Sequence, residues 1–127
     1  MPLSYIRTVP ILRSFDEAKA REFYIGFLGF TVDWEHRFAP GAPLYMQVSR
    51  SGVVFHLSEH HGDGSPGAHV RIDITGVTEL HAELSGKRYK NNSPGLERPE
   101  WGGIEVTVID PVGNHITFAE AEAALCV

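Results

Sequence analysis

The stretch that most constrains the fold runs from Trp101 to Glu120, WGGIEVTVIDPVGNHITFAE. On both sides of its DPVGN segment, apolar residues alternate with polar ones, and this two-residue period is typical of half-buried β-strands. Asp110, Pro111 and Gly113 favour a tight turn between them, because each suits a backbone conformation that turns require. We therefore expect an antiparallel hairpin with an apolar face and a polar face, and we expect function on the polar face.

The composition limits the classes of protein to consider. A chain of 127 residues is the size of one domain, and the pattern below divides it into halves at 1–62 and 63–127. The net charge of −5 argues against a nucleic-acid partner. No apolar run approaches the roughly 20 residues that a membrane span needs, and the first residues do not resemble an export signal. The single cysteine, Cys126, cannot form an internal disulfide, so we expect a cytoplasmic protein without membrane or nucleic-acid partners.

The first half predicts a strand, a helix and three more strands. Residues 5–12 form the first strand, which is at an edge or bends at Pro10 because proline cannot donate to a ladder. Ser14 and Glu17 have the spacing of a capping box, and the helix that follows ends at Gly29. Residues 30–34, 44–49 and 53–58 alternate between apolar and polar, which predicts the remaining strands of this half.

The second half repeats this order. Residues 70–74 predict a strand, a helix runs from Val77 to Gly86, and the hairpin closes the half. The polar segment 87–100 stays unassigned, with a short edge strand left open. The Gly-rich segment 59–67 predicts a joint, in which His60 and His61 are read as residues of a solvated loop.

Three motifs resemble those of a known family: VPIL in the first strand, FYIGFLGF in the first helix, and WGGIEVTVIDPVGNHITF. Together they are similar to the vicinal oxygen chelate superfamily, which includes glyoxalase I, extradiol dioxygenases and bleomycin-resistance proteins, and they most resemble the bleomycin-resistance branch. The resemblance implies an α+β fold in which two βαβββ modules form a cupped, mostly antiparallel sheet cavity. It also implies a homodimer with ligand clefts between subunits, and it leaves open an exchange of the N-terminal strand at Pro10.

Enzymes of this superfamily hold a divalent metal at four places. By resemblance these places are Val9, His56, His69 and Thr117. Only the two histidines are good ligands, whereas a catalytic site needs about three protein ligands and an open position. Candidates for a third ligand on the polar face are Asp73, Glu105 and His115. We expect no metal and no catalysis, with both histidines lining the cavity. The alternative is a metal-dependent lyase, isomerase, dioxygenase or thiol transferase.

The candidate ligand-binding residues lie on the polar face or at its rim. They are Trp34, Phe38, Tyr45, His56, His69, Arg71, Trp101 and Glu105. Rim aromatics stack on flat groups and attract cations, although packing explains Trp34 and Phe38 equally well. An ion pair with Asp73 is the structural alternative for Arg71. These residues predict a protein that sequesters a planar cationic antibiotic or related small molecule without catalysis, and an unidentified metabolite is a third hypothesis.

Overall fold

A computed structural model describes residues 2–89 and 92–122, so Cys126 lies outside the described residues. The elements of the first half are β1 (Ile11–Arg13), α1 (Glu17–Arg21), the π-helix η1 (Glu22–Phe27), β2 (Thr31–His36), β3 (Tyr45–Arg50) and β4 (Val53–Ser58). Those of the second half are β5 (His69–Asp73), α2 (Val77–Lys87), β6 (Leu96–Glu97), β7 (Ile104–Ile109) and β8 (His115–Glu120).

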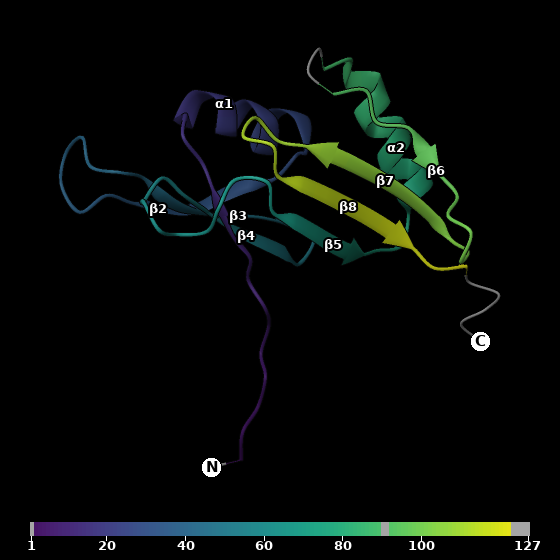
Figure 1. Ribbon diagram of the computed structural model, residues 1–127, viewed down its shortest axis with the longest axis horizontal. Coiled ribbons are helices and arrows are strands. Elements are labelled where there is room, and N and C mark those ends of the chain that lie inside the picture. Colours follow the sequence, from purple (N-terminus) through teal and green to yellow (C-terminus); the bar gives the residue numbers. More distant parts are fainter. Residues whose placement is uncertain (1, 90–91, 123–127) are drawn as a thin grey trace.

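The strands form two four-stranded sheets with the same topology (Figure 1). Sheet 1 has the order β1-β4-β3-β2, and sheet 2 has the order β5-β8-β7-β6. The first strand of each sheet pairs in parallel with the last strand in sequence, and the other pairs are antiparallel. This arrangement confirms the expected α+β fold of two βαβββ modules.

The apolar face of each sheet contributes to one shared core. Val48 and Phe55 of sheet 1 and Val106 and Ile116 of sheet 2 are at most 1% exposed, and all four belong to one cluster of buried side chains. The helical segment α1–η1 adds its aromatic side chains to that cluster, and α2 packs on β7 and β8. The alternation in the sequence therefore assigned the core-facing side of these strands correctly.

The first helix begins and continues differently from the prediction. Asp16, and not Ser14, caps it: the Asp16 carboxylate accepts from the backbone N–H of Lys19 at 3.1 Å. Ser14 is buried, and its N–H donates to the Ser58 carbonyl at 2.8 Å, which extends the pairing beside β1. After Arg21 the chain winds into the wider π-helix η1, whose aromatic side chains all remain buried.

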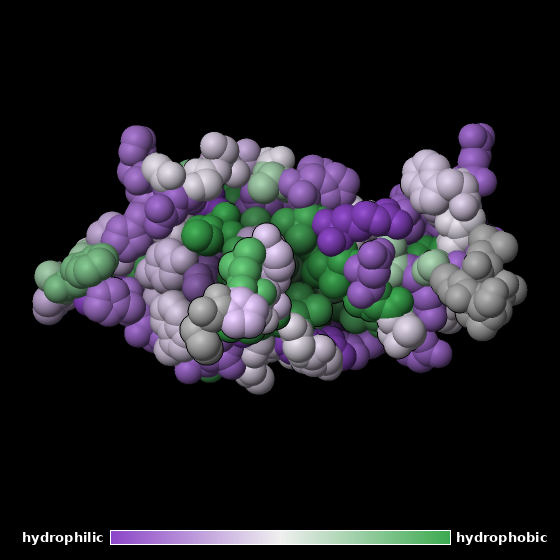
Figure 2. Space-filling view, turned by 90° about the horizontal axis from the view of Figure 1, so that it is seen from below, coloured by the Kyte–Doolittle hydropathy of each residue, from purple (hydrophilic) through white to green (hydrophobic). Residues whose placement is uncertain are grey.

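The first strand is shorter than predicted. Only residues 11–13 pair with β4, while residues 2–10 extend away from the body (Figure 1). Pro10 has no N–H for a ladder, and its carbonyl accepts the last bond, from His56 N at 2.9 Å. Leu3, Tyr5 and Ile6 are 80–92% exposed. Figure 2 shows apolar side chains gathered around the base of this N-terminal segment.

Residues 87–100 contain the short strand that the sequence left open, β6, which pairs with β7 at the edge of sheet 2. Helix α2 continues one residue past Gly86 to Lys87, and Arg88 ends it in the left-handed conformation with φ of 50°. Within residues 2–89 and 92–122, no helix is long and apolar enough to cross a membrane.

The DPVGN turn fixes the joint between the halves. The Asn114 side-chain oxygen accepts from the backbone N–H groups of Gly67 and Ala68, both at 3.1 Å. The amide of Asn114 donates to the Arg13 carbonyl at 3.2 Å and to the Asp110 carboxylate at 2.8 Å. One buried side chain therefore connects the turn after β7, the chain entering β5 and the end of β1.

Candidate functional site

A β-bulge at Asp33 positions the aromatic side chains of β2. Val32 pairs with Val48 on the core-facing side, and the next paired residue is Trp34, opposite Gln47. Regular alternation would place Val32 and Trp34 on the same face. Because Asp33 is an extra residue in the ladder, Trp34 instead faces the polar side of sheet 1.

Six rings meet on this polar face, and we call them the ring cluster. They belong to Trp34, His36, Phe38, Tyr45, His56 and His60. Trp34 and Tyr45 stack with centroids 5.9 Å apart and planes within 8°, and the His56 ring meets both of them edge-on at 5.2 Å. Three strands and two loops contribute to the cluster, so no single sequence motif contains it.

The ring cluster borders an open cavity of about 450 Å³. Its lining residues are Trp34, His36, Phe38, Tyr45, His60 and Asp63. The carboxylate of Asp63 accepts from the Ser58 hydroxyl at 2.9 Å and raises the pKa of Tyr45, after the larger effect of burial on that phenol. Stacked rings beside a carboxylate form a site suited to a flat or cationic organic group.

A chain of hydrogen bonds runs behind the rings. Asp33 accepts from the Gln47 amide at 3.0 Å, Gln47 Oε1 lies 3.0 Å from His56 Nε2, and His56 Nδ1 lies 2.7 Å from the Tyr45 hydroxyl. Burial, and to a lesser degree the positive charge of Arg7, lowers the pKa of His56. The pKa of Asp33 is lowered by its hydrogen bonds from Gln47 and Ser49.

The polar face of sheet 2 carries a second group of side chains. His69 Nε2 lies 2.8 Å from the hydroxyl of Thr117, which lies 2.8 Å from the hydroxyl of Thr107. Arg71 of β5 donates to the Glu105 carboxylate of β7 at 2.6 Å, diagonally across β8, which lies between these two strands. This face therefore offers an imidazole, hydroxyl groups and an ion pair.

Arg71 contacts both acidic neighbours, with a clear preference. Its Nε is 3.8 Å from Asp73, whose side chain is 89% exposed, whereas the side chain of Glu105 is 12% exposed. The pKa of Arg71 is raised, above all by the hydrogen bond to Glu105 and further by the negative charges of Glu105 and Asp73, while desolvation opposes this rise. The ion pair anticipated with Asp73 is therefore long and solvated, and Glu105 is the main partner.

The structure divides the eight sequence-predicted residues into three groups. Trp34, Phe38, Tyr45 and His56 meet on sheet 1. His69, Arg71 and Glu105 meet on sheet 2. Trp101 stands alone in the turn before β7 and is 73% exposed.

The sequence reading missed several members of the site. His60 was interpreted as part of a solvated loop, but its ring contacts Phe38 and Tyr45. Its Nε2 atom is buried and has no hydrogen-bond partner among residues 2–89 and 92–122. His36 and Asp63 were not selected either. A signal for His36 was present in the sequence: it follows Trp34 by two residues, so regular alternation along one strand places both on the same face. His61 is exposed, as expected.

The side chains at the superfamily's metal-binding positions, among them His56, His69 and Thr117, are poorly arranged to bind a metal ion. Both ring nitrogens of His56 are engaged by Tyr45 and Gln47, and Thr117 occupies one nitrogen of His69. In residues 2–89 and 92–122, no three His, Cys, Asp or Glu side chains group closely enough to hold a metal ion.

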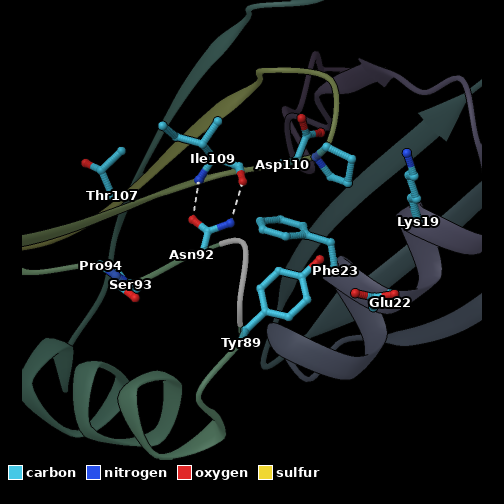
Figure 3. A pocket seen from close by; sticks show the side chains of 11 residues that line it. Lys19, Glu22, Phe23, Tyr89, Asn92, Ser93, Pro94, Thr107, Ile109 and Asp110 are labelled. Atoms are coloured by element: carbon cyan, nitrogen blue, oxygen red, sulfur yellow. Dashed lines mark hydrogen bonds between the residues drawn. The ribbon is translucent and has the colours of Figure 1, made fainter.

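A separate cavity of about 670 Å³ lies beside the C-terminal end of β7 (Figure 3). Asn92 borders it and takes the place of a strand partner: its amide donates to the Ile109 carbonyl at 2.7 Å, and its oxygen accepts from Ile109 N at 3.0 Å. Phe23, Tyr89 and Asp110 also line it. None of the eight predicted ligand-binding residues lines this cavity, so the ring cluster remains the candidate site.

Comparison with known proteins supports the fold and the family. Residues 2–124 match the family described as glyoxalase superfamily protein. No curated protein matches the chain. Among solved structures, a bleomycin-binding protein complexed with bleomycin is 20% identical, with a TM-score of 0.72, and the alignment covers 93% of this chain and 100% of that one.

Two further solved structures come from Streptomyces. The bleomycin-binding protein of bleomycin-producing Streptomyces verticillus, complexed with copper(II)-bleomycin, is 24% identical with a TM-score of 0.71, covering 95% of this chain and 100% of that one. TnmS3, an antibiotic-binding protein from Streptomyces sp. CB03234, is 19% identical with a TM-score of 0.69, covering 96% and 99%. At these identities the likeness shows a shared fold.

Proposed function

The chain belongs to the glyoxalase superfamily, and from this membership and the site geometry we propose that it is a binding protein of the bleomycin-resistance kind. It holds a planar, cationic antibiotic or a related small molecule without converting it. The ligand occupies a cleft between two copies of the chain. We place the protein in the cytoplasm and treat residues 1–62 and 63–127 as the two modules of a single binding domain.

The observation that carries this proposal is the ring cluster with its carboxylate. Trp34 and Tyr45 present parallel faces, and Asp63 lies in the same cavity. An aromatic face attracts a cation by about 0.5–2 kcal/mol, the larger values applying where water is excluded. The net charge of −5 adds a weak attraction at longer range.

The dimer part of the proposal follows from how the candidate residues are divided. Those of sheet 1 and those of sheet 2 form separate groups, and Trp101 joins neither of them. A second copy that sets its sheet 2 against sheet 1 of the first brings these groups to one cleft. The exposed apolar side chains of Leu3, Tyr5 and Ile6 supply a segment for exchange at Pro10.

The binding test uses tryptophan fluorescence. The chain contains two tryptophans, Trp34 and Trp101. Titration with a bleomycin-type drug is expected to quench the fluorescence with saturation at one drug per cleft, because Trp34 belongs to the ring cluster and Trp101 is a predicted ligand-binding residue. Variants Trp34→Phe and Trp101→Phe assign the quenching to each residue. A drug that leaves the fluorescence of all three proteins unchanged contradicts binding of that class of ligand.

Two further experiments test that the protein does not convert its ligand and that it forms a dimer. Mass spectrometry of the drug after prolonged incubation is expected to recover it unmodified, and a protein-dependent product contradicts pure sequestration. Light scattering after gel filtration is expected to give a dimer of two 14.0 kDa chains. Removal of residues 1–9 is expected to shift this equilibrium towards the monomer, and a full-length protein that is monomeric at micromolar concentrations contradicts the shared cleft.

A further inference from the structure

We propose that the hydrogen-bond chain Asp33–Gln47–His56–Tyr45 makes the cavity selective for ligands whose cationic group carries N–H bonds, and that Gln47 is the residue that sets this selectivity. The proposal rests on the binding function above and specifies the chemical class of the group bound in the ring cluster. It distinguishes a protonated amine, amidine or guanidine from a fully methylated ammonium of the same charge.

The direction of donation along these hydrogen bonds is set by Asp33, at the solvent-exposed end of the series. The Asp33 carboxylate can only accept, so the Gln47 side chain must turn its NH₂ group towards Asp33, at 3.0 Å, and its oxygen towards His56. Gln47 Oε1 can only accept in turn, so His56 must carry its proton on Nε2, at 3.0 Å from that oxygen. In a neutral imidazole the other nitrogen, Nδ1, is then an acceptor.

Tyr45 is the last member of this series of hydrogen bonds. Its hydroxyl lies 2.7 Å from His56 Nδ1 and must donate its only proton there. The phenol oxygen therefore has only lone pairs left for the cavity. The exposed carboxylate of Asp33 thus determines the direction of the Tyr45 hydroxyl through the two side chains between them, Gln47 and His56.

The resulting cavity attracts hydrogen-bond donors. The Tyr45 oxygen and the Asp63 carboxylate are both acceptors, and the stacked ring faces of Trp34 and Tyr45 are electron-rich. A protonated amine or guanidine satisfies the acceptors and the rings together. A quaternary ammonium of the same charge satisfies the rings but leaves the phenol oxygen without a donor, and burial of an unsatisfied polar group is costly.

The test compares two probes with the same ring and the same charge, benzylammonium, whose nitrogen carries three hydrogens, and benzyltrimethylammonium, whose nitrogen carries three methyl groups. Binding is followed by tryptophan fluorescence in a Trp101→Phe background, in which Trp34 is the only indole. The measured quantity is the dissociation constant of benzyltrimethylammonium divided by that of benzylammonium. This ratio cancels effects on stacking that both probes share. The starting protein is expected to favour benzylammonium.

Variants then separate the hydrogen bond from the ring. Tyr45→Phe keeps the stacking face and removes the acceptor, so the ratio is expected to fall by roughly tenfold, which corresponds to one hydrogen bond to a charged donor. Gln47→Leu leaves Tyr45 in place but no longer holds the proton on His56 Nε2. His56 is then free to donate from Nδ1, the Tyr45 proton turns into the cavity, and the ratio is expected to fall similarly while benzyltrimethylammonium still binds.

Further controls make the outcomes decisive. Asp33→Ala frees the Gln47 amide to rotate and is expected to reduce the ratio as Gln47→Leu does. Thr31→Ala changes an exposed hydroxyl on the same strand that bonds to the Ser49 carbonyl and is not part of the chain, so it is expected to keep the ratio. An unchanged ratio in Gln47→Leu and Asp33→Ala overturns this inference and leaves the proposed binding function standing. A protein that binds neither probe nor a bleomycin-type drug overturns both.

Discussion

The Tyr24 hydroxyl donates a 2.7 Å hydrogen bond to the carboxylate of Asp110, 86 residues further along the chain. Both side chains are buried, Tyr24 at 1% and Asp110 at 6% exposure. The bond connects the π-helix of the first half with the turn after β7 in the second half. Burial, together with the negative charge of Asp110, raises the pKa of Tyr24 well above its usual value, so the phenol remains a donor.

We expect Tyr24→Phe to lower the free energy of unfolding by about 1.5–3 kcal/mol, because a buried hydrogen bond to a charged group is lost while the ring is kept. Urea denaturation followed by circular dichroism measures this change. Tyr5→Phe removes the same atom from a side chain that is 90% exposed and serves as the matched control. Equal stability of Tyr24→Phe and the starting protein would show that the bond contributes nothing.

Two glycines are expected to respond to alanine with opposite signs. Gly103 has φ of +86°, and a Cβ placed there would lie 2.6 Å from the Glu120 carbonyl oxygen, so Gly103→Ala should destabilise the protein by about 1–3 kcal/mol. Gly86 lies within α2 with nothing near its Cβ position, so Gly86→Ala should stabilise by about 0.4–1 kcal/mol. Melting temperatures of the two variants test the pair, and a shift in the same direction for both contradicts the prediction.

The ion pair of Arg50 with Glu83 connects the two modules and should weaken in acid. Arg50 donates to both carboxylate oxygens at 2.8 Å, and these bonds lower the pKa of Glu83. A lowered pKa means that the stabilisation is present above the ordinary glutamate value and is lost as the pH falls through the folded-state pKa. Because each side chain is 35% exposed, we expect this ion pair to contribute only about 0.5–1 kcal/mol to the free energy of unfolding.

Chemical denaturation of Glu83→Gln at pH 7 and at pH 3 measures this contribution. The variant is expected to be less stable than the starting protein at pH 7 and nearly equal to it at pH 3. Glu97→Gln, on the exposed edge strand β6, provides a control, because Glu97 forms no ion pair with any of the residues that the structure describes. A deficit of the Glu83 variant that is the same at both pH values would point to a packing effect instead of the charge.

His56 is expected to make both stability and ligand selectivity depend on pH. Its lowered pKa means that the folded state resists protonation, so stability is retained above the ordinary histidine value and decreases as the pH falls towards the folded-state pKa. The groups around it are Tyr45, Gln47 and Trp34, with the charges of Arg7 and Asp33 nearby. Once protonated, His56 donates from both nitrogens, and the Tyr45 proton turns towards the cavity.

Affinities for benzylammonium and benzyltrimethylammonium measured at pH 8 and pH 5 test this dependence. Both are expected to decrease at pH 5 because of repulsion by the imidazolium, and the preference for benzylammonium is expected to decrease further. His56→Gln should lose most of this change in preference. If the preference for benzylammonium in the starting protein stays constant with pH, protonation of His56 does not change the direction of the Tyr45 hydroxyl.

Local sequence determined much of the fold. The strands of the hairpin, at residues 104–109 and 115–120, follow from alternation alone, because in each strand the alternate apolar residues share the face that packs in the core. Asp110, Gly113 and Asn114 formed the expected turn through bonds within five residues of sequence. The family motifs led to the correct superfamily, since they contain such local turns and helix ends.

Tertiary structure decided the site. The ladder between β2 and β3 fixes the extra residue at Asp33, and so the face of Trp34, because a bulge depends on the partner strand and not on local preference. The loop that returns past β4 brings His60 and Asp63 to the rings of β2 and β3. The length of β1 was likewise set by its pairing with β4. Asp16 caps the first helix in place of Ser14, whose backbone N–H bonds to Ser58 of β4. A periodic pattern assigns a residue to a face, but only the packed chain selects its neighbours on that face.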